Sequence, residues 1–301
     1  MYLPPEFIST ITKIWGQPGT TWLANLPKLI DECTQRWCLS NLETANNLSH
    51  NYVGRAWSWH HKTDVVLKIS MLSNEFLQEL VALRYYSGNG CVQLLQYDVS
   101  MGAMLLERVY PGTTLKDFFP HDDALAVEHT ISVIKKLHAN PLTNDTIHPS
   151  INEWLALLYD FSKLKIPASY LDKARTLADA LLESQPPERY LLHADLHHEN
   201  ILFDNLRGWL AIDPKGIVGE LGFEIGAFIR NPIKELAQHP EAHNILTRRF
   251  DLFSAGLQID RQRLVDWSYV QAVLAACWAL DDGNDIWEKL LECADLIEKC
   301  N

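Results

Sequence analysis

The chain has 301 residues, of which 47% are hydrophobic and 21% charged, and its formal net charge is −12 at pH 7. This composition is typical of a globular protein, and the length suits two structural units of ordinary size. The acidic balance argues against a main role in binding nucleic acid or anionic membranes, because both favour basic surfaces. It is compatible either with a cationic substrate or with an acidic surface that serves only solubility.

The cysteines and the apolar segments indicate the compartment. Six cysteines are scattered without a Cys-x-x-Cys pair, which indicates free thiols in a reducing compartment and argues against zinc. The chain begins without a basic segment followed by an apolar one, so no export signal is visible. The most apolar run, residues 269–280, is too short to span a bilayer and predicts a core helix. We therefore expect a cytoplasmic protein.

The first third of the chain combines helical segments with strands. Apolar residues at helical spacing predict helix over residues 4–38, broken at Gly16-Gln17-Pro18-Gly19, which cannot continue a helix. Alternation and aromatic residues over 41–69 predict two or three antiparallel strands. Ser73 is expected to cap the helix that follows. The other predicted elements of this part are a helix at 74–86 and strands at 92–97 and 103–108.

From about residue 114 the pattern is mostly helical, with one interruption. Apolar residues over 200–203 and 209–212 flank a turn at 204–208 and predict a hairpin. Helices are predicted near residues 114–119, 122–138, 151–162, 168–184, 232–238, 242–256, 260–280 and 284–299. The element order predicts an α+β fold with two lobes. Residues 1–107 form a smaller lobe with an antiparallel sheet, and residues 108–301 form a mostly helical lobe.

Residues 191–213 carry the most informative pattern. Asp195 is followed five positions later by Asn200, and Asp213 ends the returning strand of the hairpin. The spacing His-x-Asp-x-x-x-x-Asn, then Asp, matches the catalytic set of protein kinases, with Ala194 in place of the usual Arg. This predicts Asp195 as the catalytic base that orients an acceptor hydroxyl. It predicts Asn200 and Asp213 as oxygen ligands of Mg²⁺ bound to nucleotide phosphates.

Three further positions are candidates for nucleotide binding. Lys68 lies in an apolar strand pattern, where an ammonium group needs a partner, and Glu79 on the next helix is the best one. Glu75, one turn earlier, is the alternative. Gly54 lies between two predicted strands, and it either lets the backbone approach the phosphates or is an ordinary hairpin glycine. Glu107 ends the last strand of the first lobe, where the backbone is expected to bind the adenine edge.

Several neighbours of the catalytic pattern admit two interpretations. His193, His197 and His198 form a cluster in the sequence. A histidine cluster can bind a transition metal, but we expect hydrogen-bonded scaffolding for His193 and one of the other two. Lys215 either contacts phosphate or acceptor, or forms an ion pair with Glu220.

These segments resemble the aminoglycoside phosphotransferase superfamily. The resemblance is carried by residues 193–200 and 209–216, by Gly222-Phe223-Glu224 and by Arg230-Asn231-Pro232. Ile-Asp-Pro-Lys-Gly at 212–216 and Ala-Phe-Ile-Arg-Asn-Pro at 227–232 look most like the branch of streptomycin 6-phosphotransferase and hydroxyurea phosphotransferase. Matches upstream at 79–112 and downstream at 271–283 extend it over nearly the whole chain. Ala194 and Glu199 depart from it, since the superfamily commonly has Gly at both positions.

The resemblance implies a protein-kinase-like fold, ATP as donor, Mg²⁺, and a small hydroxylated acceptor. The leading acceptor is an aminoglycoside of the streptomycin type, whose phosphorylation inactivates the antibiotic. By motif position, Asp195 is the base, Asn200 and Asp213 bind the metal, and Lys68 with Glu79 clamps the phosphates. An acidic acceptor site with an aromatic floor is expected from Glu220, Glu224, Trp278, Asp281, Asp282 and Asp285, unless these are solvated helix ends.

Two other functions remain open from the sequence. One is a metabolic kinase for an amino alcohol or a sugar, and the other is a nucleotide-binding regulator without turnover. Intact Lys68, Asp195, Asn200 and Asp213 argue against the regulator. No nucleic-acid or membrane partner is expected, and the chain is expected to act as a monomer or homodimer.

Overall fold

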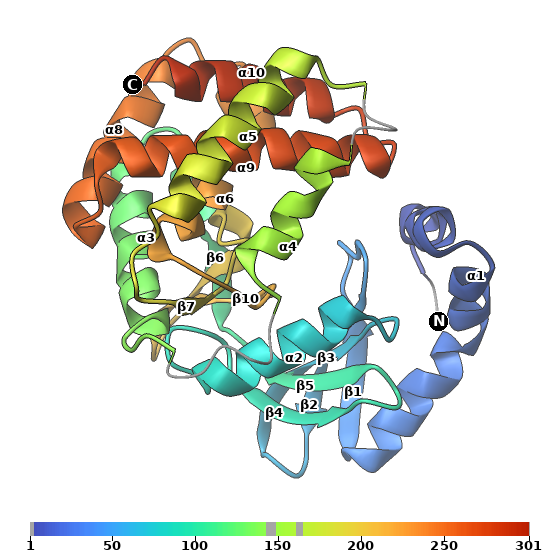
Figure 1. The fold of residues 1–301 in the computed structure, drawn as a ribbon. Coiled ribbons are helices and arrows are strands. Elements are labelled where there is room, and N and C mark those ends of the chain that lie inside the picture. The colour runs from blue at the N-terminus through green and yellow to red at the C-terminus, as the bar shows by residue number, and fades with distance from the viewer. Residues whose placement is uncertain (1–2, 143–148, 161–164, 301) are drawn as a thin grey trace. The chain divides into compact units, whose positions relative to one another are not determined.

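The structure, a computed structural model, describes residues 3–142, 149–160 and 165–300. The chain divides into two compact units (Figure 1). Unit 1 comprises Met1–Gly88 and Val92–Val109, and unit 2 comprises Asn89–Cys91 and Tyr110–Asn301. The sequence passes from one unit to the other after Val109, two residues beyond the predicted division at 107 and 108.

Unit 1 begins with the long helix α1 (Pro5–Arg36), which changes direction at Gly16. Gly16 has φ 56° and ψ −132°, a conformation that glycine adopts without the steric cost of a side chain. The predicted break at residues 16–19 is therefore confirmed. Helix α2 (Asn74–Tyr86) starts at Ser73, whose hydroxyl accepts a hydrogen bond from the Phe76 N–H, as the sequence predicted.

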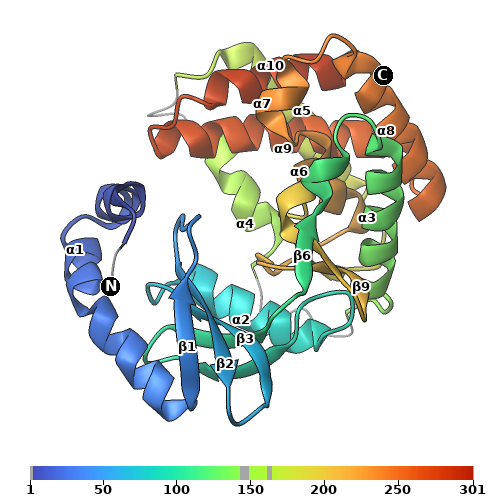
Figure 2. The ribbon, with the colours of Figure 1, turned by 180° about the vertical axis from the view of Figure 1, so that it is seen from behind.

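A five-stranded antiparallel sheet forms the centre of unit 1. Its strands are, in order across the sheet, β1 (Leu39–Thr44), β2 (Tyr52–Ser58), β3 (Thr63–Ile69), β5 (Ala103–Glu107) and β4 (Leu94–Asp98). Helix α1 runs beside β1 (Figure 2). Phe7, Ile11 and Leu26 of α1 join Leu67 of β3 and Leu105 of β5 in one buried apolar cluster. Burial of each such side chain contributes about 1.5–3 kcal/mol, and this cluster holds the helix to the sheet.

Unit 2 is mostly helical. Its α-helices are α3 (Asp123–Leu137), α4 (Ile151–Leu155), α5 (Ala168–Glu183), α6 (Gly226–Ile229), α7 (Ile233–Ala237), α8 (Ala242–Leu257), α9 (Arg261–Asp281) and α10 (Trp287–Glu298). Single 3₁₀ turns are η1 (Leu115–Phe118), η2 (Ala156–Tyr159), η3 (His198–Asn200) and η4 (Leu221–Ile225). The predicted helix at 151–162 is α4 plus η2, and its last two residues lie outside the described residues.

Helix α9 lies in the interior of unit 2, packed against α5, α6, α8 and α10 (Figure 1). This location explains the apolar run at 269–280, most of which is buried, and confirms the prediction of a core helix. None of the helices within the described ranges is both long and apolar enough to cross a membrane. The six cysteines carry free thiols, as expected.

Two small sheets of unit 2 carry the pattern at 191–213. One contains β6 (Pro111–Thr114), β8 (Ile201–Asp204) and β9 (Gly208–Ala211), and the other pairs β7 (Tyr190–Leu192) with β10 (Ile217–Gly219). The predicted hairpin is β8 and β9, with Leu202 opposite Leu210. The loop from His193 to Asn200 thus connects β7 to β8, and the segment 212–216 connects β9 to β10. Both segments that carry the predicted catalytic residues are anchored by strands at each end.

Candidate active site

Hydrogen bonds join the loop with the predicted base to the segment with the second carboxylate. The Asn200 side-chain amide donates to the backbone carbonyl of Asp195 over 2.9 Å. The N–H of Ile212 donates to the carbonyl of Asn200 over 2.9 Å, and Asp213 follows directly. The structure therefore brings Asp195, Asn200 and Asp213 together within unit 2. The Asp195 side chain is 30% exposed, so solvent and ligands have access to its carboxylate.

His193 fastens these two segments. One ring nitrogen, Nε2, donates to the carbonyl of Ile212 over 2.7 Å, and Nδ1 accepts the N–H of Asp195 over 3.3 Å. The N–H of Lys215 donates to the carbonyl of His193. Both ring bonds require a neutral imidazole protonated at Nε2, and burial lowers the pKa of His193 in agreement with this. The predicted scaffolding role of His193 is confirmed.

The two neighbouring histidines bind different partners. His197 Nδ1 accepts the N–H of Glu199 at the start of η3. The His198 ring is 1% exposed and stacks on Phe228 with ring centroids 3.9 Å apart. Burial lowers the pKa of His198 to about 3, so this ring is neutral. These contacts agree with scaffolding rather than with a shared metal ion.

A buried ion pair lies beneath His198. Arg249 donates from Nε to both carboxylate oxygens of Asp123, at 3.1 and 3.0 Å. Its Nη1 donates to the carbonyls of Phe228 and Ile229 at the end of α6 and of Asn231 beyond it. Its Nη2 lies 3.4 Å from His198 Nε2. Burial opposes ionisation of Asp123, but the hydrogen bonds and the positive charge of these partners outweigh it and lower the pKa of that carboxyl.

Glu224 binds the backbone of the loop 193–200, which carries the predicted base and is called the catalytic loop below. It is fully buried, Oε1 accepts the N–H of His193 over 2.9 Å, and Oε2 accepts the N–H of Ala194 over 2.8 Å. His138 Nε2 lies 3.0 Å from Oε1. Burial alone would raise the pKa of Glu224, but the bonds and charges of His138 and its other neighbours lower it. The interpretation of Glu224 as an acceptor-binding residue is wrong, because its oxygens are enclosed and occupied.

Two residues of the site have left-handed backbones. Ala194 has φ 63° and Asp213 has φ 59°. This conformation costs roughly 1–2 kcal/mol for a residue with a side chain. The bond from the Ala194 N–H to Glu224 offsets part of that cost. Left-handed residues of this kind often occur at functional sites, where the surrounding structure maintains them.

The ion pair predicted in unit 1 is present. Lys68 Nζ on β3 lies 2.6 Å from Glu79 Oε1 on α2, and the two side chains are only 4% and 11% exposed. An ammonium group at this depth is stabilised by its carboxylate partner. Glu75 is exposed on the same helix, so the alternative pairing is wrong.

The sequence left the roles of Gly54 and Glu107 open, and the structure shows what each residue contacts. Gly54 lies inside β2, where a Cβ would stand 2.8 Å from Leu42 Cδ1 and 2.9 Å from the Tyr52 hydroxyl. Gly54 is thus a closely packed glycine in the hairpin of β2 and β3, where it pairs with Leu67, and an approach of its backbone to the phosphates stays a prediction. The Glu107 N–H donates to the carbonyl of Gln93, and its carboxylate accepts the Gln93 N–H. An adenine contact at this strand end stays a prediction.

The residues predicted for acceptor binding separate into two groups. Glu220 is buried and accepts from Arg263 Nη2 and Trp267 Nε1, each over 2.6 Å. It therefore neither faces an acceptor nor pairs with Lys215, and both interpretations of Glu220 are wrong. The half-buried Trp278 packs edge to face on Trp154 with ring centroids 5.0 Å apart. The exposed members at the end of α9 and beyond it are Asp281, Asp282 and Asp285.

Two cations near the site were not predicted. Arg230 places Nη2 3.8 Å from Asp195 Oδ1, although the sequence directed attention to it only as part of a family pattern. The signal that was missed is its position directly after the apolar run 225–229, where a charged side chain needs a partner. The same reasoning predicted the partner of Lys68 in its apolar strand. Lys116 lies 3.2 Å from Glu199, and the hydrogen bond to this carboxylate raises the pKa of Lys116. The extra anion at position 199 is thus balanced locally.

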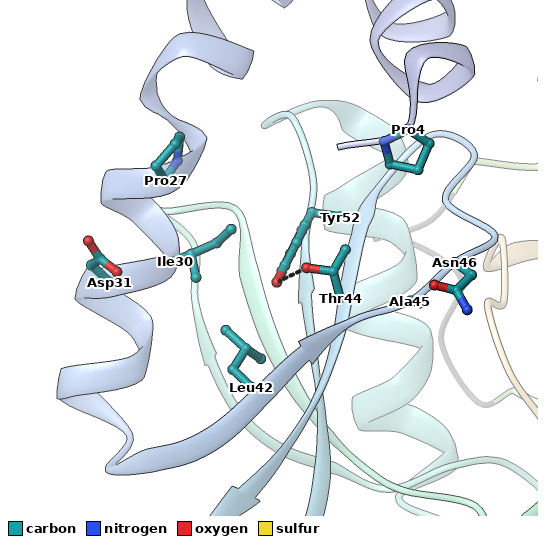
Figure 3. A pocket seen from close by; sticks show the side chains of 9 residues that line it. All are labelled: Pro4, Pro27, Ile30, Asp31, Leu42, Thr44, Ala45, Asn46 and Tyr52. Carbon is teal, nitrogen blue, oxygen red and sulfur yellow. Dashed lines mark hydrogen bonds between the residues drawn. The ribbon is translucent and has the colours of Figure 1, made fainter. Parts of the chain in front are cut away.

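A pocket of about 780 Å³ lies within unit 1, between α1 and the end of β1 (Figure 3). The residues around it are Pro4, Pro27, Ile30, Asp31, Leu42, Thr44, Ala45, Asn46 and Tyr52. The hydroxyl groups of Thr44 and Tyr52 bind each other over 3.2 Å. None of the predicted site residues lines this pocket, so we assign it no part in the chemistry of the site.

The donor atoms around Asn200 fit Mg²⁺. The Asn200 amide nitrogen donates to the Asp195 carbonyl, which leaves the amide oxygen as an acceptor, and Asp213, whose side chain is exposed, follows the residue that binds the Asn200 backbone. Carboxylate and amide oxygens are the ligands that this small, hard cation prefers. The remaining positions of an octahedral shell are usually filled by phosphate oxygens and water.

The sheet with its Lys–Glu pair and the helical unit with its Asp-Asn-Asp loop define a protein-kinase-like phosphotransferase fold. Solved structures agree. A choline/ethanolamine kinase family protein from Mesorhizobium loti is similar with a TM-score of 0.61, 20% identity, and coverage of 90% of this chain and 93% of that one. The aminoglycoside phosphotransferase APH(4)-Ia is similar with a TM-score of 0.62, 15% identity, and coverage of 90% and 98%. The predicted two-lobed α+β fold is confirmed.

The model of the aminoglycoside/hydroxyurea antibiotic resistance kinase family matches residues 54–283, and the chain belongs to this family. Streptomycin 6-kinase of Streptomyces griseus is 29% identical over 295 residues, covering 94% of this chain and 92% of that protein. Hydroxyurea phosphotransferase of Kitasatospora aureofaciens is 28% identical over 293 residues, covering 94% and 81%.

Proposed function

We propose that this protein is an ATP-dependent O-phosphotransferase that acts on a hydroxyl of a small molecule, with an aminoglycoside of the streptomycin type as acceptor. One observation carries the proposal: Asp195 has an accessible carboxylate on a loop whose backbone is fixed by His193, Asn200 and Glu224. Membership of the kinase family and the similarity to streptomycin 6-kinase support the same reaction.

Each predicted residue has a role in this reaction. The Asp195 carboxylate orients the acceptor hydroxyl and accepts its proton. The oxygens of Asn200 and Asp213 hold Mg²⁺, which when bound neutralises charge on the nucleotide phosphates. Lys68, kept in place by Glu79, binds phosphate oxygens. Little covalent chemistry is required, because phosphoryl transfer depends mainly on orientation and electrostatic stabilisation.

The acceptor is expected to carry positive charge. Trp278 offers an aromatic surface, and Asp281 and Asp282 place carboxylates about one turn further along α9. Aromatic faces and carboxylates both attract ammonium and guanidinium groups. The net charge of −12 favours the approach of such a molecule. A cytoplasmic location and a monomeric or homodimeric state belong to the same proposal.

An acceptor screen tests the proposed function. Purified protein is given Mg²⁺-ATP and, separately, streptomycin, hygromycin B, hydroxyurea and choline, and ADP release and product mass are measured. We expect turnover on the streptomycin-type acceptor. Turnover on choline alone would favour a metabolic kinase. Nucleotide-dependent thermal stabilisation without turnover on any acceptor would favour a regulator and contradict the proposal.

Two variants separate the roles within the site. Asp195→Ala is expected to lose at least about 100-fold in rate while ATP still binds. Asp213→Ala is expected to weaken binding of Mg²⁺-ATP, measured by calorimetry, with little effect on ATP without the metal. Asp251→Ala is a control, since its carboxylate pairs with Arg261 at the surface of α8. Unchanged Mg²⁺-ATP affinity in Asp213→Ala would show that the metal assignment is wrong.

A further inference from the structure

Arg230 is a buried cation next to the carboxylate of Asp195. Its side chain is 11% exposed, and Nη2 lies 3.8 Å from Asp195 Oδ1. Within the described ranges, Asp195 supplies the only carboxylate at ion-pair distance from Arg230. A buried guanidinium costs free energy unless a negative charge lies close, so the pairing restrains both groups.

The distance between the two groups leaves Asp195 available for chemistry. Charge-assisted hydrogen bonds between guanidinium and carboxylate groups are about 2.7–2.9 Å long. At 3.8 Å, Arg230 attracts the carboxylate without taking up its lone pairs in a closed salt bridge. Oδ1 can therefore still accept the proton of an acceptor hydroxyl while the neighbouring charge limits its rotation.

Gln271 on α9 sets the place of the Arg230 guanidinium. Its Oε1 accepts from Arg230 Nη1 over 3.4 Å, and its Nε2 donates to the carbonyl of Phe223. The side chain of Gln271 fills the space beside Gly226, where a Cβ would lie 2.4 Å from Nε2 and from Cδ. Only glycine at position 226 therefore leaves room for the Gln271 side chain between α6 and α9.

We propose that Arg230 is a positioning residue that orients Asp195 for proton transfer, and that Gln271, admitted by Gly226, positions Arg230. The inference rests on the proposed function, because it concerns the base of that reaction. Packing alone does not explain why a buried arginine points at the carboxylate of Asp195, or why the carbonyl of Gln271 faces that arginine. Positioning of Asp195 accounts for both contacts.

The test compares Arg230→Ala and Arg230→Lys with the wild type on an acceptor that the wild type phosphorylates. We expect kcat of Arg230→Ala to fall about 100-fold, as for a small misplacement of a catalytic group, with the KM for ATP unchanged. Arg230→Lys is expected to retain part of the rate. Millimolar guanidinium is expected to restore part of kcat in Arg230→Ala and to leave Asp195→Ala inactive.

A second pair of variants acts through the positioning residue. Gln271→Met keeps the volume of the side chain and removes the carbonyl, and Gly226→Ala displaces the side chain. Both are expected to lower kcat about 10-fold with an unchanged KM for ATP, and neither is expected to lower it further when Arg230 is already alanine. Arg261→Gln, also on α9 but paired at the surface with Asp251, is the control and is expected to keep the wild-type rate.

The outcomes are distinguishable. If the wild type phosphorylates no acceptor, the proposed function and this inference both fail. If the wild type is active, Asp195→Ala is inactive and Arg230→Ala keeps kcat within about threefold, only the inference fails. A loss in Arg230→Ala that guanidinium does not restore, in a variant with an unchanged melting temperature, also overturns it. Should Arg230→Ala not fold, wild-type kcat in both Gln271→Met and Gly226→Ala overturns it as well.

Discussion

Replacing Glu224 by glutamine tests how the catalytic loop is held. The carboxylate accepts the N–H groups of His193 and Ala194, one on each oxygen, and both acceptors are buried. Glutamine keeps the size of the side chain but retains only one oxygen. If its NH₂ group takes the place of Oε2, it faces the N–H of Ala194. If it takes the place of Oε1, it faces both the N–H of His193 and His138 Nε2.

The magnitude follows from these contacts. A buried donor left without a partner costs about 1–3 kcal/mol, and the remaining bond loses its charge assistance, worth about another 1 kcal/mol. Ala194, at φ 63°, is also released from the bond that helps to hold its left-handed backbone. We expect unit 2 to lose about 3 kcal/mol of unfolding free energy, and kcat to fall at least about 10-fold because Asp195 follows Ala194 directly.

The assay is urea unfolding followed by circular dichroism, together with steady-state kinetics. Glu220→Gln is the matched control, because Glu220 is equally buried in the neighbouring sequence but binds Arg263 and Trp267 instead of the loop. It is expected to lower stability while kcat is retained. Wild-type kcat in Glu224→Gln would refute the bracing role. An equal loss of kcat in Glu220→Gln would show that general destabilisation explains the effect.

Two further predictions concern residues of the same loop. Ala194→Gly removes the cost of the left-handed backbone, so thermal unfolding is expected to show a gain of about 0.5–1 kcal/mol with activity retained; a loss of stability would contradict the strain at φ 63°. Burial lowers the pKa of His198 to about 3, against roughly 6.5 in an unfolded chain, so stability is complete above pH 6.5 and decreases as the pH falls. Between pH 7 and pH 5, His198 is expected to lower the free energy of unfolding, measured in urea, by about 2 kcal/mol. His198→Asn should abolish this decrease, and an identical pH dependence in the variant would disprove the assignment.

Local patterns in the sequence predicted most elements and the centre of the site. Helices α2 and α9 and the hairpin β8–β9 follow from capping, apolar spacing and turn residues, which act over a few positions. The catalytic loop was also predictable, since Asn200 binds the Asp195 backbone five residues away. Strands β6, β7 and β10 were missed, because they have three or four residues and pair with segments far away in the chain.

The sequence by itself determined the fold class, the Asp195, Asn200 and Asp213 set and the Lys68–Glu79 pair, because these depend on short spacings or on one obvious buried charge. Only the tertiary structure decided the roles of Glu220 and Glu224. Both lie in the apolar stretch 217–229, where a carboxylate needs a buried partner, but their partners Arg263 and His138 lie 43 and 86 positions away in the sequence. Which donors surround a buried carboxylate depends on segments that only the tertiary fold brings together, and local composition does not contain that information.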